Sequence, residues 1–144
     1  MAVIDASVYV ALINARAPDH ASSWAWFQQA QSDQEAISAP VILLAEVADA
    51  VSRGIGDSTL AHQVVEQLRR SPIIELVAIN SALAVRAAAI AADHRLRGCD
   101  AVYVALAEEM DDCLVTLDQQ QLERGAAVVS TRKPEALNYV QSTL

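Results

Sequence analysis

Short runs of apolar residues alternate along the chain with longer stretches in which apolar side chains recur three or four positions apart. The short runs are typical of buried strands, and the longer stretches of helices that pack one face against a core. The runs predict strands at residues 2–4, 35–38, 73–79, 113–117 and 127–130. The periodic stretches predict helices at residues 8–13, 20–31, 40–52, 58–70, 80–96, 100–110 and 119–124, with a last helical turn or two within 134–140.

The regular alternation of these elements determines the expected architecture. Strands that alternate with helices favour an α/β fold with a mostly parallel central sheet of about five strands, flanked by helices. Glu75 interrupts the apolar run 73–79, so we expect that strand at an edge of the sheet. No linker, internal repeat or low-complexity segment divides the sequence, and we expect residues 1–144 to form a single domain.

Individual residues refine two of the predicted helices. Pro40 suits the first turn of a helix, where its missing N–H leaves no partner unpaired, so we expect the third helix to begin there. Trp24 and Phe27 lie three positions apart and are expected in the core. Trp26 lies off that face and is either half-buried or part of a partner surface.

The composition is that of a globular chain, because 53% of its residues are hydrophobic and 19% are charged. Two cysteines, Cys99 and Cys113, make neither a disulfide framework nor a zinc-binding spacing. No basic, apolar leader precedes Asp5, and no apolar run approaches the ~18 residues that cross a bilayer. We therefore expect a soluble, cytoplasmic protein with no membrane partner.

The net charge of −8 argues against a general binder of polyanions. Such binding comes from lysine and arginine side chains that neutralise phosphates, and Lys133 is the only lysine in the chain. A protein of this composition that handles a phosphate backbone needs a few well-placed arginines and another positive group. A bound divalent metal would serve.

Four acidic residues occupy positions that the predicted fold brings together. Asp5 and Asp118 directly follow predicted strands, Asp100 opens a helix, and Glu46 lies in the second turn of another helix. Each has a local explanation, because aspartates cap helices and a glutamate can reach solvent from the edge of an apolar stripe. In a parallel sheet, however, the carboxyl ends of the strands share one edge, where ligands bind. All four side chains can converge there.

Carboxylates gathered in one cleft repel each other and raise each other's pKa unless a cation lies between them. Mg²⁺ and Mn²⁺ prefer oxygen ligands and keep several waters, so either ion would resolve the repulsion. Such a site suits metal-assisted attack on a phosphodiester, in which the metal lowers the pKa of a bound water and offsets charge in the transition state. The acidic residues thus predict metal-dependent phosphodiester hydrolysis.

Four segments, in this order and separation, resemble the PIN-domain ribonucleases and, within them, the VapC-type toxins of toxin–antitoxin pairs. The resemblance covers essentially the whole chain. The segments are Val3-Ile4-Asp5-Ala6-Ser7, Leu44-Ala45-Glu46-Val47, Gly98-Cys99-Asp100-Ala101-Val102-Tyr103-Val104-Ala105-Leu106-Ala107 and Leu114-Val115-Thr116-Leu117-Asp118.

The resemblance implies a PIN-like domain and an endoribonuclease that uses Mg²⁺ or Mn²⁺ to cleave RNA. It also implies a homodimer and a cognate antitoxin whose tail occupies the active-site groove. By this resemblance the catalytic, metal-binding residues would be Asp5, Glu46, Asp100 and Asp118. Ser7 and Thr116 would be hydroxyl partners that orient a ligand or water. The strongly acidic net charge and the near absence of lysine are unlike those of a typical RNA-binding protein.

Several alternatives stay open from the sequence. Arg95 and Arg97 precede Asp100 and either contact substrate phosphates or an antitoxin carboxylate, or balance charge at a helix end. A PIN-fold nuclease that processes RNA outside a toxin–antitoxin pair, and a non-catalytic module that binds a partner, would share the fold. A receiver-like signalling domain would also be α/β, but it needs paired acids after the first strand and a lysine after the last strand. Lys133 lies near the required place for the lysine, whereas Asp5 has no acidic neighbour.

Overall fold

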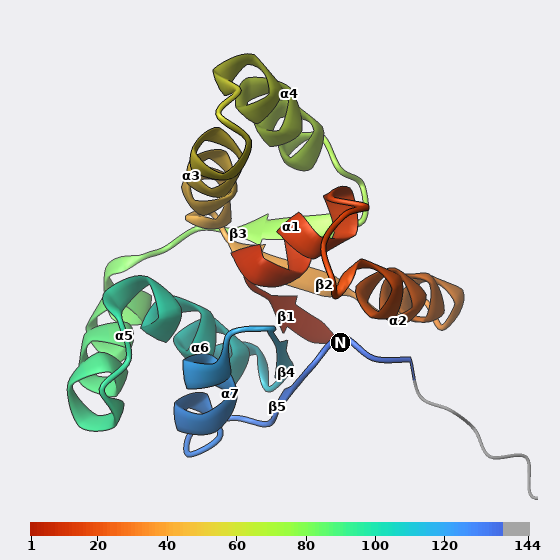
Figure 1. Ribbon diagram of the computed structural model, residues 1–144. Coiled ribbons are helices and arrows are strands. Elements are labelled where there is room, and N and C mark those ends of the chain that lie inside the picture. The colour runs from red at the N-terminus through yellow and green to blue at the C-terminus, as the bar shows by residue number, and fades with distance from the viewer. Residues whose placement is uncertain (137–144) are drawn as a thin grey trace, which may run out of the picture.

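A computed structural model of the chain describes residues 1–136, which form a five-stranded parallel sheet covered by helices (Figure 1). The strand order is β3-β2-β1-β4-β5, and every pair is parallel. The strands are β1 (Ala2–Ile4), β2 (Ile37–Pro40), β3 (Ile74–Val77), β4 (Cys113–Val115) and β5 (Thr131–Arg132). The helices within the described residues are α1 (Ala6–Ile13), α2 (His20–Ser32), α3 (Leu43–Ile55), α4 (Ser58–Arg69), α5 (Ser81–His94), α6 (Gly98–Met110) and α7 (Gln119–Gly125). The predicted α/β architecture is confirmed.

The central strand β1 fixes the register of the sheet. Its three residues are fully buried, and Ala2 lies opposite Ile37 of β2 on one side and Cys113 of β4 on the other. A strand buried on both faces is apolar throughout, as parallel sheets require. β3 forms one edge of the sheet, and the exposed Glu75 lies in it, as the sequence predicts. The carboxyl ends of β1 and β4 therefore lie side by side.

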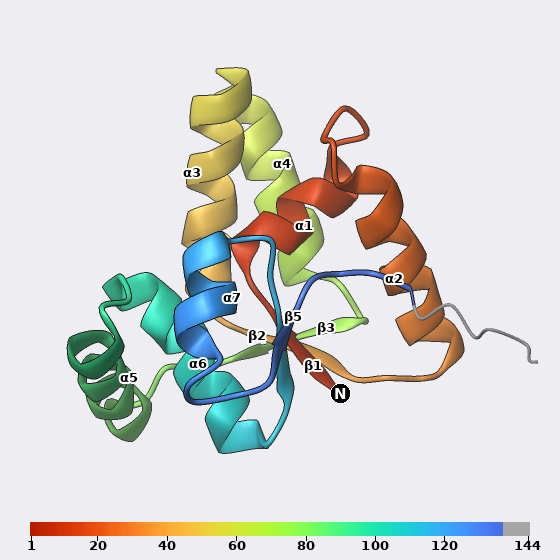
Figure 2. The ribbon, with the colours of Figure 1, turned by 60° about the horizontal axis from the view of Figure 1, so that its bottom comes forward.

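Helix α6 is the most buried helix of the fold and packs across β1, β2 and β4. Small residues such as Ala101, Ala105 and Ala107 let it lie close to the sheet. α5 packs beside α6. α3 and α4 pack against each other as a hairpin that projects away from α5 and α6 (Figures 1 and 2). Among the described residues, no helix combines the length and apolar character needed to cross a membrane.

Two local expectations were wrong. Pro40 ends β2 opposite Val77 instead of beginning a helix, and α3 begins at Leu43. The last strand is Thr131–Arg132, because residues 127–130 form a turn in which the N–H groups of Val128 and Val129 both donate to the carbonyl of Gly125. The helical turn expected within 134–140 lies largely outside the described residues and stays a prediction.

The expectation for the aromatic residues of α2 was also wrong. Trp26 is buried, Trp24 is 44% exposed and Phe27 is partly buried. The buried face of α2 consists of Ser23, Trp26 and Ala30, which recur at helical spacing. This face could not be recognised from the hydrophobic pattern because Ser23, one of its three buried residues, is polar. Trp24 stacks on His20 at the surface instead.

Candidate functional site

Asp5 lies at the point where β1 passes into α1, and it is 3% exposed. Its Oδ1 accepts hydrogen bonds from Ser7 Oγ at 2.6 Å and from the N–H of Val8 at 3.3 Å, which caps α1. Its Oδ2 accepts from Thr116 Oγ1 at 2.6 Å and from Gln121 Nε2 at 3.0 Å. Burial raises the pKa of Asp5 to about 6, and the hydroxyl hydrogen bonds only partly offset that rise.

The hydroxyls of Ser7 and Thr116 join Asp5 to the end of β4. Ser7 Oγ accepts from the N–H of Leu117 at 3.0 Å, and Thr116 Oγ1 accepts from the N–H of Asp118 at 3.0 Å. Each hydroxyl thus accepts one bond from the backbone and donates one to Asp5. The resemblance implies that these hydroxyls orient a ligand or water, and in this structure the group that they orient is Asp5.

Asp100 lies in the first turn of α6 and is 8% exposed. Its Oδ1 accepts a hydrogen bond from Gln121 Nε2 at 2.9 Å. Its Oδ2 is buried and accepts no hydrogen bond from the described residues, although Arg97 Nε lies 3.3 Å away. Burial, and then the charge of Asp118, raise the pKa of Asp100.

Asp118 and Glu46 complete the group of acids. Asp118 caps α7, since its Oδ1 accepts from the N–H of Gln121 at 2.9 Å, and its Oδ2 lies 3.7 Å from Arg97 Nη2. Glu46 projects from the first turn of α3 and is partly buried, and its Oε1 accepts from the hydroxyl of Tyr103 at 2.5 Å. Burial raises the pKa of Glu46, and the charge of Asp100 adds to that rise.

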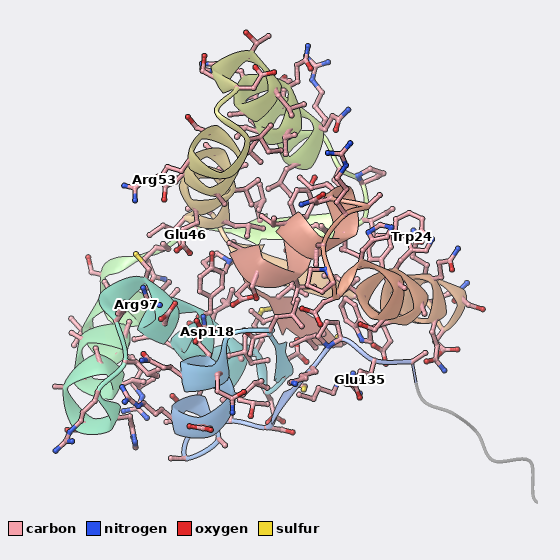
Figure 3. All side chains as sticks on the ribbon, in the orientation of Figure 1. Trp24, Glu46, Arg53, Arg97, Asp118 and Glu135 are labelled. Atoms are coloured by element: carbon pink, nitrogen blue, oxygen red, sulfur yellow. The ribbon has the colours of Figure 1, made fainter. Side chains whose placement is uncertain are left out.

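These four side chains open onto one hollow, which we call the acidic cleft. Figure 3 shows Glu46 of α3, Arg97 just before α6 and Asp118 just before α7 around it, while Arg53 of α3 points to the outside. Arg95 does not line the cleft, and its carbonyl accepts from the guanidinium of Arg124. The residues lining the cleft are Asp5, Ala6, Ser7, Glu46, Arg97, Gly98, Cys99, Asp100, Tyr103 and Asp118.

The residues of the acidic cleft suit a divalent cation by their chemistry. Its negatively charged groups are all carboxylates, whose oxygens are the metal ligands that Mg²⁺ and Mn²⁺ prefer. Asp100 Oδ2 is a buried, charged oxygen without a hydrogen-bond donor, and the nearest positive group is the largely exposed guanidinium of Arg97. Among the described residues, no three acidic, histidine or cysteine side chains stand close enough together to hold a metal ion unaided. An ion in the cleft would therefore be held by one or two carboxylates and would complete its coordination with waters, as is usual for Mg²⁺.

Two residues of the site were not predicted from the sequence. Tyr103 was expected only as part of an apolar helix face, yet its hydroxyl bonds Glu46. Gln121 was expected only within a short helix, yet its buried amide contacts both Asp5 and Asp100. A positional signal existed for both, because each follows an acidic residue of the site by three positions on a helix and so lies on the same side.

Comparisons with known proteins agree with this geometry. The family model described as PIN domain matches residues 2–127. Solved structures with the same fold include the Mycobacterium tuberculosis toxin VapC20, described as cleaving the sarcin-ricin loop, with 17% identity and a TM-score of 0.74 over 93% of this chain and 100% of that one. A search of curated proteins found no match.

Two further solved structures share the fold. FitAcB from Neisseria gonorrhoeae is 16% identical with a TM-score of 0.68, and the match covers 93% of this chain and 98% of that one. VapBC2 from Rickettsia felis, bound to a DNA fragment from its promoter, is 12% identical with a TM-score of 0.69, covering 92% and 97%. Similarity at these identities is a similarity of fold.

Proposed function

Because the chain belongs to the PIN domain family, we propose that it is a Mg²⁺- or Mn²⁺-dependent endoribonuclease and the toxin of a toxin–antitoxin pair. The observation that carries this proposal is the acidic cleft, where Asp5, Glu46, Asp100 and Asp118 meet from four separate segments. For three of them, Asp5, Glu46 and Asp100, the pKa is raised by burial, so the charged forms lack compensation that a cation would provide.

The residues that would hold the metal are the four carboxylates of the acidic cleft. The ion would supply a water of lowered pKa and offset the charge that develops on the phosphodiester. Ser7 and Thr116 keep Asp5 in place through their hydroxyls, and Tyr103 does the same for Glu46. Arg97 lines the cleft with a largely exposed guanidinium, which can reach a phosphate oxygen of RNA.

The toxin role, the partners and the location are part of the same proposal. One similar structure is described as a toxin and another, from Klebsiella pneumoniae, as a toxin–antitoxin complex, which supports a cognate antitoxin as partner. We propose that residues 1–144 form one nuclease domain, that it acts as a homodimer, and that it cleaves RNA in the cytoplasm. The net charge of −8 implies that RNA is held by the metal and a few arginines instead of a broad basic surface.

Cleavage of RNA by the purified chain tests the enzymatic part. Mixed-sequence single-stranded RNA and ribosomal RNA should be cut with Mg²⁺ or Mn²⁺, and EDTA should stop the reaction. Asp100→Asn should abolish cutting, whereas Asp93→Asn, on the exposed surface of α5, should not. Cutting that survives Asp100→Asn, or that persists in EDTA, would refute the assignment.

Expression in a bacterial host tests the toxin part. The wild-type chain should arrest growth in a manner that requires Asp100. A small open reading frame beside the gene should encode a protein that relieves the arrest when it is co-expressed. An active nuclease that leaves growth unaffected would instead fit an RNA-processing enzyme outside a toxin–antitoxin pair.

A further inference from the structure

Gln121 makes hydrogen bonds to the acids of the cleft that the formation of helix α7 does not require. It lies in the first turn of α7, and only 2% of its surface is exposed. Its single side-chain nitrogen, Nε2, donates to Asp5 Oδ2 at 3.0 Å and to Asp100 Oδ1 at 2.9 Å. Its backbone N–H donates to Asp118 Oδ1. One residue therefore contacts three of the four acids.

The orientation of this amide follows from its partners. A carboxylate can only accept hydrogen bonds, so both Asp5 and Asp100 require the NH₂ end of the Gln121 amide. The other end, Oε1, is buried and has no donor among the described residues. An unpaired buried oxygen is unfavourable, so two charge-assisted hydrogen bonds must outweigh it. No packing requirement for a polar group at this position is evident, since an apolar side chain would avoid the unpaired oxygen.

The bridge joins two carboxylates that have no direct link to each other. Asp5 follows β1, whereas Asp100 lies in α6, and both are buried with raised pKa values. The amide hydrogens reduce the repulsion between the two charges and occupy one oxygen of each. Asp100 Oδ2 is left without a hydrogen bond, beside the Arg97 guanidinium that lines the cleft.

We propose that Gln121 is a positioning residue, which holds Asp5 and Asp100 at a fixed separation in the metal-free protein and so prepares them to share a divalent cation. The effect on metal binding rests on the metal-dependent function proposed above, whereas the bridge itself rests on the hydrogen bonds of Gln121 to Asp5 and Asp100. Groups that orient metal ligands in this way commonly contribute 10- to 100-fold to metal affinity.

Calorimetric titration of the metal-free chain with Mn²⁺ tests this role without any measurement of activity. Gln121→Leu keeps a side chain of similar size and removes the amide, and it should weaken Mn²⁺ binding by about tenfold or more. Gln120→Leu is the matched control, because Gln120 is the adjacent, exposed residue of the same helix, and its binding should equal that of wild type. Equal affinity in wild type and Gln121→Leu would overturn the proposal.

A second measurement needs no substitution at position 121. In the NMR spectrum of the metal-free wild-type chain, the side-chain NH₂ of Gln121 should exchange with solvent much more slowly than that of Gln120. Asp100→Asn should perturb that NH₂ resonance and speed its exchange. An amide that exchanges as fast as that of Gln120 would show that no bridge exists and would overturn the proposal.

The two arms separate this proposal from the proposed function. If the wild-type chain binds no Mn²⁺, the metal-dependent function is refuted, and the exchange of the Gln121 amide alone decides whether the bridge forms. If the wild type binds Mn²⁺ and Gln121→Leu binds it equally well, the function stands and the positioning role of Gln121 is refuted.

Discussion

The raised pKa of Asp5 predicts how the stability of the metal-free protein depends on pH. The carboxyl has a pKa of about 6 in the folded protein against 3.8 for the unperturbed group. Between these values the folded state binds more protons than the unfolded state, so the free energy of unfolding falls as the pH rises. The stabilisation by the protonated carboxyl is fully present below about pH 4 and is lost as the pH passes through about 6.

The size of the effect follows from the shift in pKa. A shift of about two units corresponds to about 3 kcal/mol when the pH is well above both values. Between pH 5 and pH 7 the share from Asp5 is about 1 kcal/mol, because at pH 5 the unfolded state has already lost most of its proton.

Urea unfolding in EDTA, followed by circular dichroism, measures the effect. The free energy of unfolding should fall between pH 5 and pH 7 in wild type, and Asp5→Asn should remove about 1 kcal/mol of that fall. The comparison concerns the slope with pH, so a constant change in stability from altered hydrogen bonds cancels. Asp93→Asn is the control, since its carboxyl is exposed. Equal slopes in wild type and Asp5→Asn would refute the reasoning.

Further predictions concern single side chains. Tyr103→Phe removes the donor to Glu46 and should weaken Mn²⁺ binding by about tenfold in calorimetry, while the ring still fills its buried site. Arg97→Ala removes a positive charge that competes with the metal for Asp100, so it should strengthen Mn²⁺ binding by up to about fivefold and should slow RNA cleavage. Arg53→Ala, which breaks an exposed ion pair outside the cleft, should change neither. Gly125→Ala should destabilise the fold by about 1 kcal/mol in thermal unfolding, because a Cβ there would lie 3.3 Å from methyl groups of Val104 and Thr131. Gly54→Ala, in a helix with no atom within 4 Å of the added Cβ, should stabilise it by roughly 0.5–1 kcal/mol.

The central part of the sheet could be predicted because β1 is an apolar run that is buried on both faces, whereas the edge strand β3 contains a charged residue. Ala2, Val3 and Ile4 are buried as a continuous run, and Glu75 correctly indicates that β3 is an edge strand. The last strand could not be located in this way. Val128 and Val129 form an apolar run, but they lie in a turn after α7, and the strand that pairs with Leu114 begins at Thr131.

The acids of the site could be predicted, but the groups that hold them could not. Asp5 and Asp118 follow strands, and strand ends meet at one edge of a parallel sheet whatever the details of packing. Gln121 and Tyr103 act through single atoms at the ends of their side chains. Their spacing from Asp118 and Asp100 places them on the right side of a helix, yet an inward-facing glutamine or tyrosine has many other uses.

The hydrogen bonds of the acidic cleft distinguish the four acids from one another. Both oxygens of Asp5 accept two hydrogen bonds each, which uses all of its lone pairs. Asp5 can therefore contact a metal only by giving up a donor, and the longest of its four bonds, from the N–H of Val8, is the one most easily lost. Asp100 has an oxygen that accepts no hydrogen bond from the described residues. Of these two acids, Asp100 is thus the one with an oxygen ready to bind a cation, while Asp5 is held by four hydrogen bonds that only partly offset the cost of burying its charge.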